Sequence, residues 1–343
     1  MTQQITRRGF VGSALAGSIV AAPAVLSAQT KLRWRCQSMW SAAETSYKAF
    51  EDFCKRVGVA SGGRLEIVPF AAGSVVGVFE TLDAVSAGVL DAHSTAPVYW
   101  TGKDAGFSVI GDLNFAYQHP WQAEAWYYHR GGLDMLREAY ARYNVYPVGV
   151  SWWGLEALVS KKPLQGTADL KGMKVRTPQG MFGEIITKLG ASVVVVPGGE
   201  VYSALDKGVV DAADWATESM NFRMGFFEVA KTSIRIGHSM PVQEFAVNTA
   251  KWNALPDDLK AIVNSCVREW TWDQVQRIAV EDTRAVADIR SKGGTAGTWS
   301  DAEVQKIREL AQKTWEEWSK KTPLAKKAYD SQITWLKALG ILA

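Results

Sequence analysis

Short apolar runs alternate along this chain with stretches in which apolar residues recur every three or four positions. The short runs are typical of buried strands, and the periodic stretches are typical of helices that pack one face on a sheet. In the first half, the pattern predicts strands at 31–37, 64–70, 88–92 and 145–150. It predicts helices at 42–57, 81–87 and 122–143, the last interrupted at Gly131-Gly132. Strands that alternate with helices at this spacing predict an α/β fold with mostly parallel sheets.

The second half repeats this alternation and then becomes helical. Strands are predicted at 155–160, 174–176, 192–196, 209–213 and 243–248, and helices at 180–188 and 201–207. No helix breaker interrupts the apolar pattern from Pro256 to about Ser291, which predicts one long helix. Ser300 and Glu303 form a capping-box pattern before another helix, and a last helix follows Pro323. This last helix packs either on its own protomer or on that of a neighbour.

The first 28 residues have the pattern of an export leader. Thr6-Arg7-Arg8-Gly9-Phe10 is a twin-arginine signature, and Leu26-Ser27-Ala28 is a suitable cleavage site. The apolar run between them is short and interrupted by Pro23, which argues against a membrane helix. We therefore expect export by the twin-arginine pathway and a soluble protein in the periplasm.

The mature chain is too long for one hydrophobic core. Removal of 28 from 343 residues leaves 315, so we expect two lobes. We assign residues 29–152 and about 241–270 to lobe I, 153–240 and about 271–320 to lobe II, and 321–343 to a C-terminal helix. No Pro/Gly/Ser-rich linker separates the lobes, which favours a hinged pair with the long helix spanning both lobes.

Charge and cysteine content narrow the function. Without Arg7 and Arg8, the 38 basic residues fall to 36 against 35 acidic residues, a net charge of +1 that gives no basis for nucleic-acid binding. Three cysteines without CxxC spacing argue against a disulfide framework or a zinc site. Three buried, inert thiols are the favoured state, although Cys36 and Cys54 could pair.

Arg176 is the first candidate for chemistry. It ends the predicted strand 174–176, and Thr177-Pro178 offers a capping residue and a first-turn proline for a following helix. A guanidinium at such a position can hold a carboxylate with two parallel hydrogen bonds, and a helix N-terminus adds to the attraction. A structural salt bridge is the alternative for a lone arginine.

Three segments resemble a known family. They are Asp91 to Asp104, Lys171 to Arg176, and Pro197 to Trp215. Together they look like the substrate-binding proteins of tripartite ATP-independent periplasmic (TRAP) transporters, and most like the branch that binds 2-oxo or 2-hydroxy monocarboxylates. The resemblance implies a two-lobed periplasmic binding protein fold, closure on the ligand, delivery to a membrane permease, and no catalysis.

The resemblance also assigns residues. It implies that Arg176 fixes the ligand carboxylate. It also implies that Asp214 and Trp215 are the branch's acidic-Trp pair, in which the acid helps to hold a cation or a ligand hydroxyl. Tyr99 and Trp100 match an aromatic pair on the first lobe. The branch includes dimers that exchange C-terminal helices, so a homodimer is one reading of the last helix.

The chain departs from the branch in its pocket. Trp152 and Glu156 stand where amide side chains are expected, and His238 lies in a segment where an acidic residue is expected. Glu156 could join Asp214 and Trp215 around a hard cation such as Ca2+ or Na+ through oxygen. The candidate walls of the pocket are tryptophans, which would suit an aromatic carboxylate as well as a small oxo acid; they are Trp40, Trp100, Trp152, Trp153 and Trp215.

Two alternatives remain beside a TRAP receptor. One is a periplasmic enzyme acting on carboxylates with Glu156, Asp214 and His238 as its acid–base set. The chain contains none of the common dinucleotide, P-loop, zinc-protease or nucleophile-elbow motifs. The other is the receptor of an ATP-driven importer, against which the Pro197–Trp215 segment argues.

Overall fold

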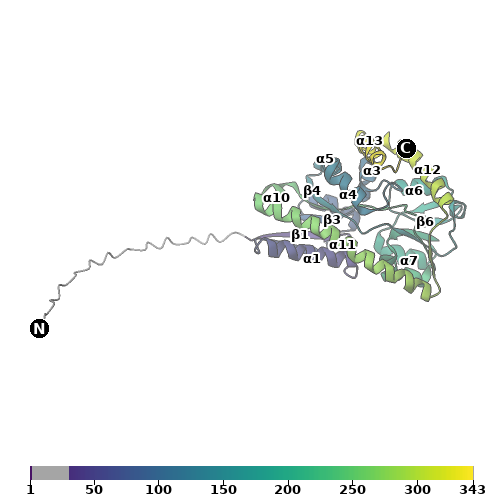
Figure 1. The fold of residues 1–343 in the computed structure, drawn as a ribbon, viewed down its shortest axis with the longest axis horizontal. Coiled ribbons are helices and arrows are strands. Elements are labelled where there is room, and N and C mark those ends of the chain that lie inside the picture. Colours follow the sequence, from purple (N-terminus) through teal and green to yellow (C-terminus); the bar gives the residue numbers. More distant parts are fainter. Residues whose placement is uncertain (2–30, 343) are drawn as a thin grey trace. The chain divides into compact units, whose positions relative to one another are not determined.

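The structure, a computed structural model, describes residue 1 and residues 31–342. The twin arginines and the cleavage site of the predicted leader lie outside the described residues. Figure 1 shows an α/β arrangement of two sheets with helices packed around them, as the alternating pattern predicts. None of the described helices combines the length and the apolar character needed to cross a membrane.

The first sheet has five strands in the order β2-β1-β3-β10-β4. Their bounds are β1 Leu32–Ser38, β2 Leu65–Phe70, β3 Ala92–Thr95, β4 Val145–Ser151 and β10 Gln243–Asn248. Only β10 runs against its neighbours, because it pairs antiparallel with both β3 and β4. Its helices include α1 (Thr45–Ala60), which packs on β2, and α5 (Gly132–Ala141), which packs on β4.

The second sheet has six short strands in the order β11-β9-β5-β8-β6-β7. Their bounds are β5 Ala157–Ser160, β6 Lys174–Arg176, β7 Ser192–Val194, β8 Ala212–Ala216, β9 Thr232–Ile234 and β11 Thr295–Gly297. Here β5 is the strand that runs against the others. Four helices accompany this sheet: α6 (Met181–Lys188), α7 (Val201–Asp206), α8 (Glu218–Arg223) and α9 (Phe226–Val229).

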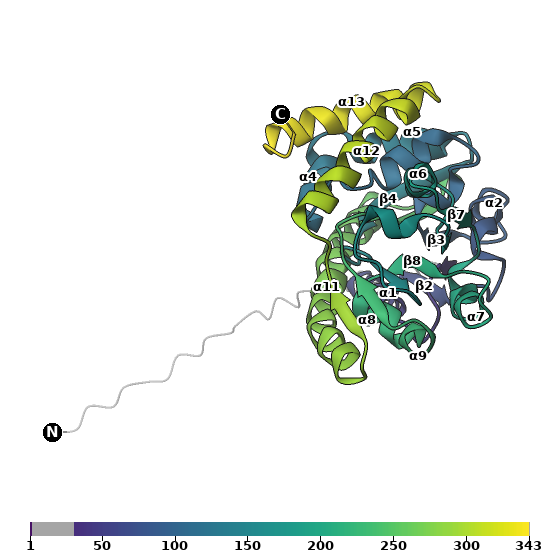
Figure 2. The same cartoon turned by 90° about the vertical axis from the view of Figure 1, so that its right-hand side faces the viewer.

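The chain passes between the sheets more than once. It leaves the first sheet after β4 to enter β5, and it returns from β9 to β10. The predicted long helix is α11 (Asp257–Ser291), which packs on α1 and β4 on one side and on α8 and β11 on the other. Figures 1 and 2 show α11 passing both groups of strands. The exact lobe boundaries stay a prediction.

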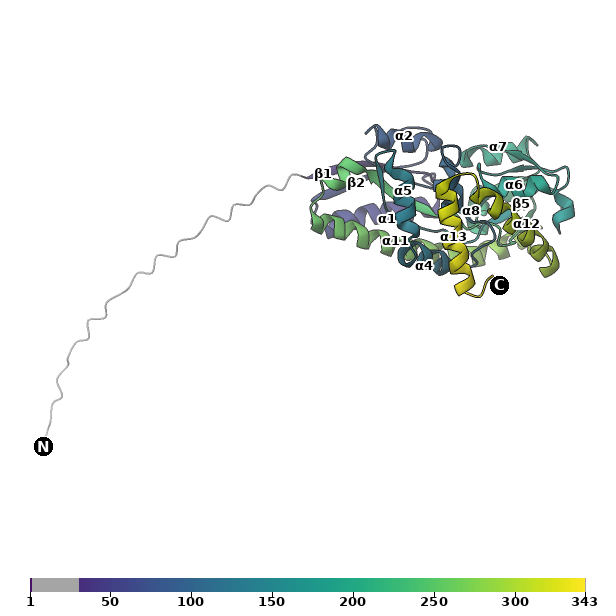
Figure 3. The ribbon, with the colours of Figure 1, turned by 90° about the horizontal axis from the view of Figure 1, so that it is seen from above.

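The C-terminal helices lie on the same chain. Helix α12 (Asp301–Ser319) packs on α6 and α3 (Ala105–Gly111), and α13 (Pro323–Ala338) packs on α3 and α5 (Figure 3). The contact is close, because a Cβ at Gly106 would lie 2.7 Å from Leu324 Cγ. A buried bond from Gln332 Nε2 to the Val109 carbonyl, at 2.7 Å, ties α13 to α3. The remaining helices of the first sheet's side are α2 (Thr81–Ser86), α4 (Pro120–His129) and α10 (Thr249–Asn253).

Several predicted boundaries are wrong. The strand placed at 88–92 is β3 at Ala92–Thr95, because residues 88–91 form a turn after α2. The strand placed at 209–213 is β8 at Ala212–Ala216, since Val209 is exposed and the pairing with β6 begins at Ala212. The helix placed at Thr177-Pro178 begins at Met181. The Thr177 amide donates to the Val194 carbonyl at 3.2 Å, which keeps the chain extended beside β7 for longer than the capping pattern suggests.

The predicted inert thiols are confirmed. All three cysteines are free and buried, and burial raises the pKa of the Cys36 and Cys54 thiols well above the ordinary value.

Candidate functional site

A small pocket lies where the two sheets meet. Several of its residues follow the carboxyl ends of parallel strands, namely β1, β3, β6 and β8, which is where open α/β sheets bind ligands. Others come from the two connections between the sheets. The lining residues are Met39, Trp40, Ala96, Val98, Tyr99, Trp153, Glu156, Arg176, Pro178, Trp215 and Pro241.

Arg176 is the buried cation of this pocket. Its Nε and Nη2 both donate to the Val196 carbonyl, at 3.1 and 3.0 Å, and its Nη1 donates to the Asp214 carbonyl. A guanidinium carries five N–H donors, so one N–H on each terminal nitrogen has no partner among the described residues. Two N–H groups on the terminal nitrogens are thus left for a ligand, and a carboxylate has two oxygens that can accept them. Because its partners are carbonyls and not carboxylates, Arg176 makes no salt bridge with the described residues.

Three tryptophans that line the pocket pack edge to face. The ring of Trp40 lies 5.0 Å from that of Trp153 and 5.8 Å from that of Trp215, both at 86°. Trp215 sits at a β-bulge, because Leu158 pairs with Asp214 while Ala157 pairs with Ala216. Such bulges re-aim side chains near binding sites. Trp40 therefore connects the first sheet to the second across the pocket.

Glycine at position 198 makes room for the Trp215 indole. A Cβ built there would lie only 2.5 Å from Trp215 Nε1, so any larger residue would displace the ring.

Two carboxyl groups and an imidazole lie together beside the pocket. His238 Nε2 is 2.8 Å from Asp214 Oδ1, and Trp153 Nε1 donates to Glu156 Oε1 at 3.1 Å. Ligand atoms of Glu156, Asp214 and His238 all lie within 4.8 Å of one another, and all three residues are buried. This is a donor set that could hold a metal ion.

The pKa values of the two carboxyl groups are shifted in opposite directions. Burial and the neighbouring Asp214 raise the pKa of Glu156 well above its usual value. Burial by itself would raise the pKa of Asp214. The neighbouring His238, the hydrogen bond from Glu156 and the positive charge of Arg176 outweigh burial, so the pKa of Asp214 is lowered. Glu156 is therefore the member of the pair that holds a proton more strongly.

A third acid lies behind this pair. Asp112 accepts from Ser239 Oγ at 2.6 Å and from Asn114 Nδ2 at 2.7 Å, and burial raises its pKa to about 7. Its oxygens are thus occupied by protein donors. No sequence pattern singled out Asp112.

The structure divides the predicted site residues into two groups. Trp40, Tyr99, Glu156, Arg176 and Trp215 line the pocket, and Asp214 and His238 adjoin it. Burial raises the pKa of the Tyr99 hydroxyl to about 12, so Tyr99 faces the pocket as a neutral phenol.

Trp100 and Trp152 lie in the packed interior instead. Trp100 Nε1 donates to the Tyr140 hydroxyl at 2.7 Å, and its ring stacks on His93. Trp152 packs against the Tyr127 ring at 5.7 Å. Neither is among the residues that line the pocket.

Several pocket residues carry no sequence signal of their own. Met39, Ala96, Val98, Pro178 and Pro241 line the pocket, yet single apolar residues of these kinds occur throughout the chain. Only their positions just after strands, or inside the connections between the sheets, could have indicated them.

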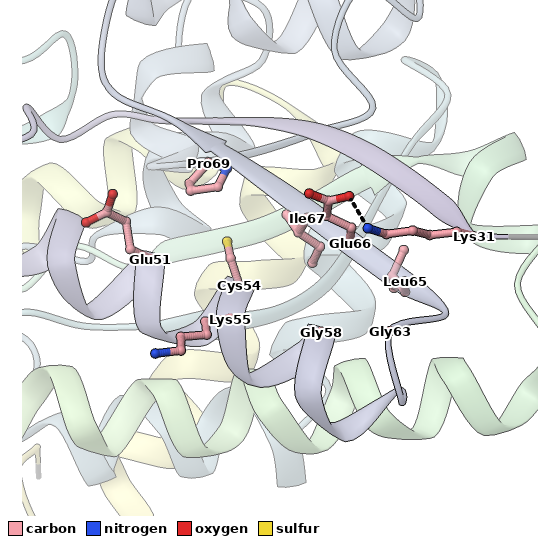
Figure 4. A pocket seen from close by; sticks show the side chains of 10 residues that line it. All are labelled: Lys31, Glu51, Cys54, Lys55, Gly58, Gly63, Leu65, Glu66, Ile67 and Pro69. Atoms are coloured by element: carbon pink, nitrogen blue, oxygen red, sulfur yellow. Dashed lines mark ion pairs between the residues drawn. The ribbon is translucent and has the colours of Figure 1, made fainter.

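A second hollow, of ≈ 380 Å³, lies between α1 and the edge strand β2 (Figure 4). Its lining includes Lys31 and Glu66, which pair with each other at 2.8 Å, and Cys54, whose thiol pKa is raised well above the ordinary value by burial. Its described residues offer no convergent set of groups comparable to Arg176 and its neighbours.

Comparisons with known proteins agree with this geometry. The model of a family described as bacterial extracellular solute-binding protein, family 7, matches residues 36–321. The chain is 30% identical to a monocarboxylate 2-oxoacid-binding periplasmic protein of Nostoc sp. over 303 residues, which cover 87% of this chain and 82% of that one.

Solved structures of TRAP solute-binding proteins share the fold. One from Rhodobacter sphaeroides, in an apo open form, is 34% identical, covers 91% of this chain and 99% of its own, and has a TM-score of 0.74. One from Bordetella bronchiseptica, a mixed-occupancy dimer with calcium and picolinate in one site, is 27% identical, covers 91% and 93%, and has a TM-score of 0.85.

Proposed function

This chain belongs to family 7 of the bacterial extracellular solute-binding proteins, and we propose that it holds a small 2-oxo monocarboxylate between its two sheets. Proteins of this family are TRAP solute receptors, so the chain is a binding protein and not an enzyme. The predictions of the family, the fold class and the absence of catalysis are confirmed. The enzyme and the ATP-driven importer are accordingly set aside.

The observation that carries the proposal is the unused half of the Arg176 guanidinium. Two N–H groups, one on each terminal nitrogen, remain after the bonds to the Val196 and Asp214 carbonyls. Arg176 as a whole is only 2% exposed, so these two groups are buried. A hydrogen bond to a charged partner contributes about 1.5–3 kcal/mol. A carboxylate is the ligand group that satisfies both.

The space in the pocket favours a small ligand. The volume open to the centre of a water molecule is ≈ 30 Å³, which is room for about two waters before any side chain moves. The best small ligands gain at most about 1.5 kcal/mol per non-hydrogen atom, so pyruvate with its six heavy atoms could gain about 9 kcal/mol. A dissociation constant of 1 μM corresponds to about 8 kcal/mol and is within reach.

A cation beside Arg176 fits the chemistry of both relatives' ligands. A 2-oxo acid and picolinate each carry a second donor atom next to the carboxylate, and the two atoms together can chelate a metal ion. Glu156 and Asp214 are buried oxygen donors placed for such an ion, and Trp215 could add only its backbone carbonyl. When bound, the ion would neutralise the carboxyl pair and polarise the 2-oxo group.

Export, delivery and assembly belong to the same proposal. The leader supports transfer to the periplasm by the twin-arginine pathway, and the family supports hand-over to a membrane permease. A homodimer through the last helix has the dimeric Bordetella structure in its favour. Helix α13 packs on α3 and α5 of its own chain, so a dimer would need either helix exchange or another surface.

Titration calorimetry with matched ligands tests the carboxylate proposal. Pyruvate should bind with one site per chain, pyruvamide should not bind because it lacks the negative charge, and propionate should bind more weakly because it lacks the 2-oxo group. Binding of picolinate would show that the tryptophan side chains of the pocket also admit an aromatic ring. Binding of pyruvamide as tight as that of pyruvate would refute the assignment of Arg176.

A further inference from the structure

We propose that Gln243 is a positioning residue of the pocket, because it fixes the orientation of the Trp40 ring that lines it. The inference rests on the proposed function and deepens it by adding a residue that the ligand does not touch. Gln243 is the first residue of β10, is fully buried, and is not among the residues that line the pocket. No sequence pattern singled it out.

The Trp40 indole has one polar atom, and Gln243 binds it. Trp40 Nε1 donates to Gln243 Oε1 at 3.1 Å, and the bond is buried. An indole N–H can only donate, so the position of its acceptor decides how the ring turns. The same ring lies edge to face against Trp153 and Trp215 in the pocket. Gln243 therefore holds, from the first sheet, a ring whose aromatic neighbours lie in the connection after β4 and in β8.

The orientation of the Gln243 amide is determined by its own partners. Its Oε1 also accepts from Gln274 Nε2 at 3.2 Å, while its Nε2 donates to Ser94 Oγ at 2.7 Å. Turning the amide over would place its NH2 group against two N–H donors, neither of which can accept a hydrogen bond. Gln243 thus has one favourable orientation, in which it presents an acceptor to Trp40.

Gln274 of α11 holds Gln243 from the other side. Gln274 Nε2 also lies 2.9 Å from the Trp152 carbonyl and 3.3 Å from Ser151 Oγ, where the chain leaves β4 for the second sheet. Of the polar side-chain atoms of these two glutamines, Gln274 Oε1 alone has no partner among the described residues. Because buried polar groups with satisfied bonds specify one arrangement, the Gln243 amide is a rigid support for Trp40.

A displaced Trp40 ring would change the space for the ligand. Trp40 lines a pocket that has room for only about two waters before a side chain moves. Removing the acceptor would leave the buried indole N–H unpaired, which favours ring orientations in which another group accepts from it. A turned indole would then occupy space that the ligand needs.

The test removes the amide and then restores the acceptor. Gln243→Met keeps the length of the side chain without its polar atoms, and it should weaken pyruvate binding about 3- to 10-fold in titration calorimetry. Gln243→Glu, protonated at this buried position, restores the acceptor for Trp40 and a donor for Ser94, so its affinity should lie within about twofold of the parent. In a Trp40→Phe background, which lacks the indole N–H, Gln243→Met should cause no further loss of affinity.

A spectroscopic readout follows the ring itself. The indole N–H signal of Trp40 in a nitrogen–proton NMR spectrum is assigned by its absence from Trp40→Phe. This signal should shift in ligand-free Gln243→Met and return towards the parent position in Gln243→Glu. Gln332→Met is the matched control, because Gln332 is another buried glutamine, which bonds to the Val109 carbonyl between α13 and α3. It should change neither the Trp40 signal nor the affinity.

A second variant covers the case in which Gln243→Met does not fold. Gln274→Met removes the other N–H donor to Gln243 Oε1 and should shift the Trp40 signal in its place. An unshifted signal in the folded variant, an equal loss of affinity in the Trp40→Phe background, or an equal effect of Gln332→Met overturns the inference. If the parent protein does not bind pyruvate, the proposed function is refuted instead, and the Trp40 signal still decides the role of Gln243.

Discussion

Replacing Arg176 by lysine should weaken carboxylate binding by about 10- to 150-fold. Lysine keeps the positive charge but offers a point charge in place of the planar fork, so one of the two ligand bonds is lost. A hydrogen bond between charged groups contributes about 1.5–3 kcal/mol, and about 1.4 kcal/mol corresponds to a tenfold change in affinity.

The same substitution should also lower stability. The carbonyls of Val196 and Asp214 accept from the buried guanidinium and would lose donors. Each buried polar group left unpaired costs about 1–3 kcal/mol. We expect Arg176→Lys to remain folded at 25 °C with a lower melting temperature.

Calorimetry with pyruvate, beside thermal unfolding of the ligand-free proteins, separates these two effects. Arg64→Lys is the matched control, because Arg64 pairs with Asp258 near the protein surface. This variant should leave the affinity for pyruvate unchanged. A folded Arg176→Lys protein whose affinity lies within threefold of the parent would show that the guanidinium does not hold the ligand.

Four further changes test other parts of the structure. Trp215→Ala should reduce pyruvate affinity by at least about tenfold in calorimetry, because it removes a side chain that lines the pocket. Trp100→Phe should lower only the stability, by at least about 1 kcal/mol in urea unfolding, through the lost bond to Tyr140 and the cavity left by the smaller ring. Burial raises the pKa of Glu244 from 4.5 to about 8, so the folded protein keeps a proton that the unfolded chain releases. The stability that this proton supports is complete below pH 4.5 and is lost as the pH rises to about 8. Glu244→Gln should therefore flatten the fall in melting temperature between pH 5 and 8. Deletion of residues 321–343 should lower the melting temperature without changing the mass in light scattering, and a dimer that dissociates on deletion would contradict the packing of α13 on its own chain.

The sequence by itself determined most of the elements and the central residue. Apolar runs marked the longer strands, and β10 and α11 fall at or within one residue of their predicted bounds. Arg176 could be selected from the sequence because it is the last residue of a short predicted strand, and the local pattern of apolar residues is sufficient to locate such a strand. The helix start after Arg176 was misplaced, since a backbone bond to β7 outweighed the capping residues.

Tertiary structure alone decided which side chains meet. Trp40, Trp153 and Trp215 line the pocket while Trp100 and Trp152 fill the interior, although each lies in or beside an apolar run. A side chain's direction depends on strand register and on which distant segment covers it, and neither is written in the local pattern. His238 reaches Asp214 only because the connection before β10 passes beside the end of β8, which brings residues 24 positions apart to 2.8 Å.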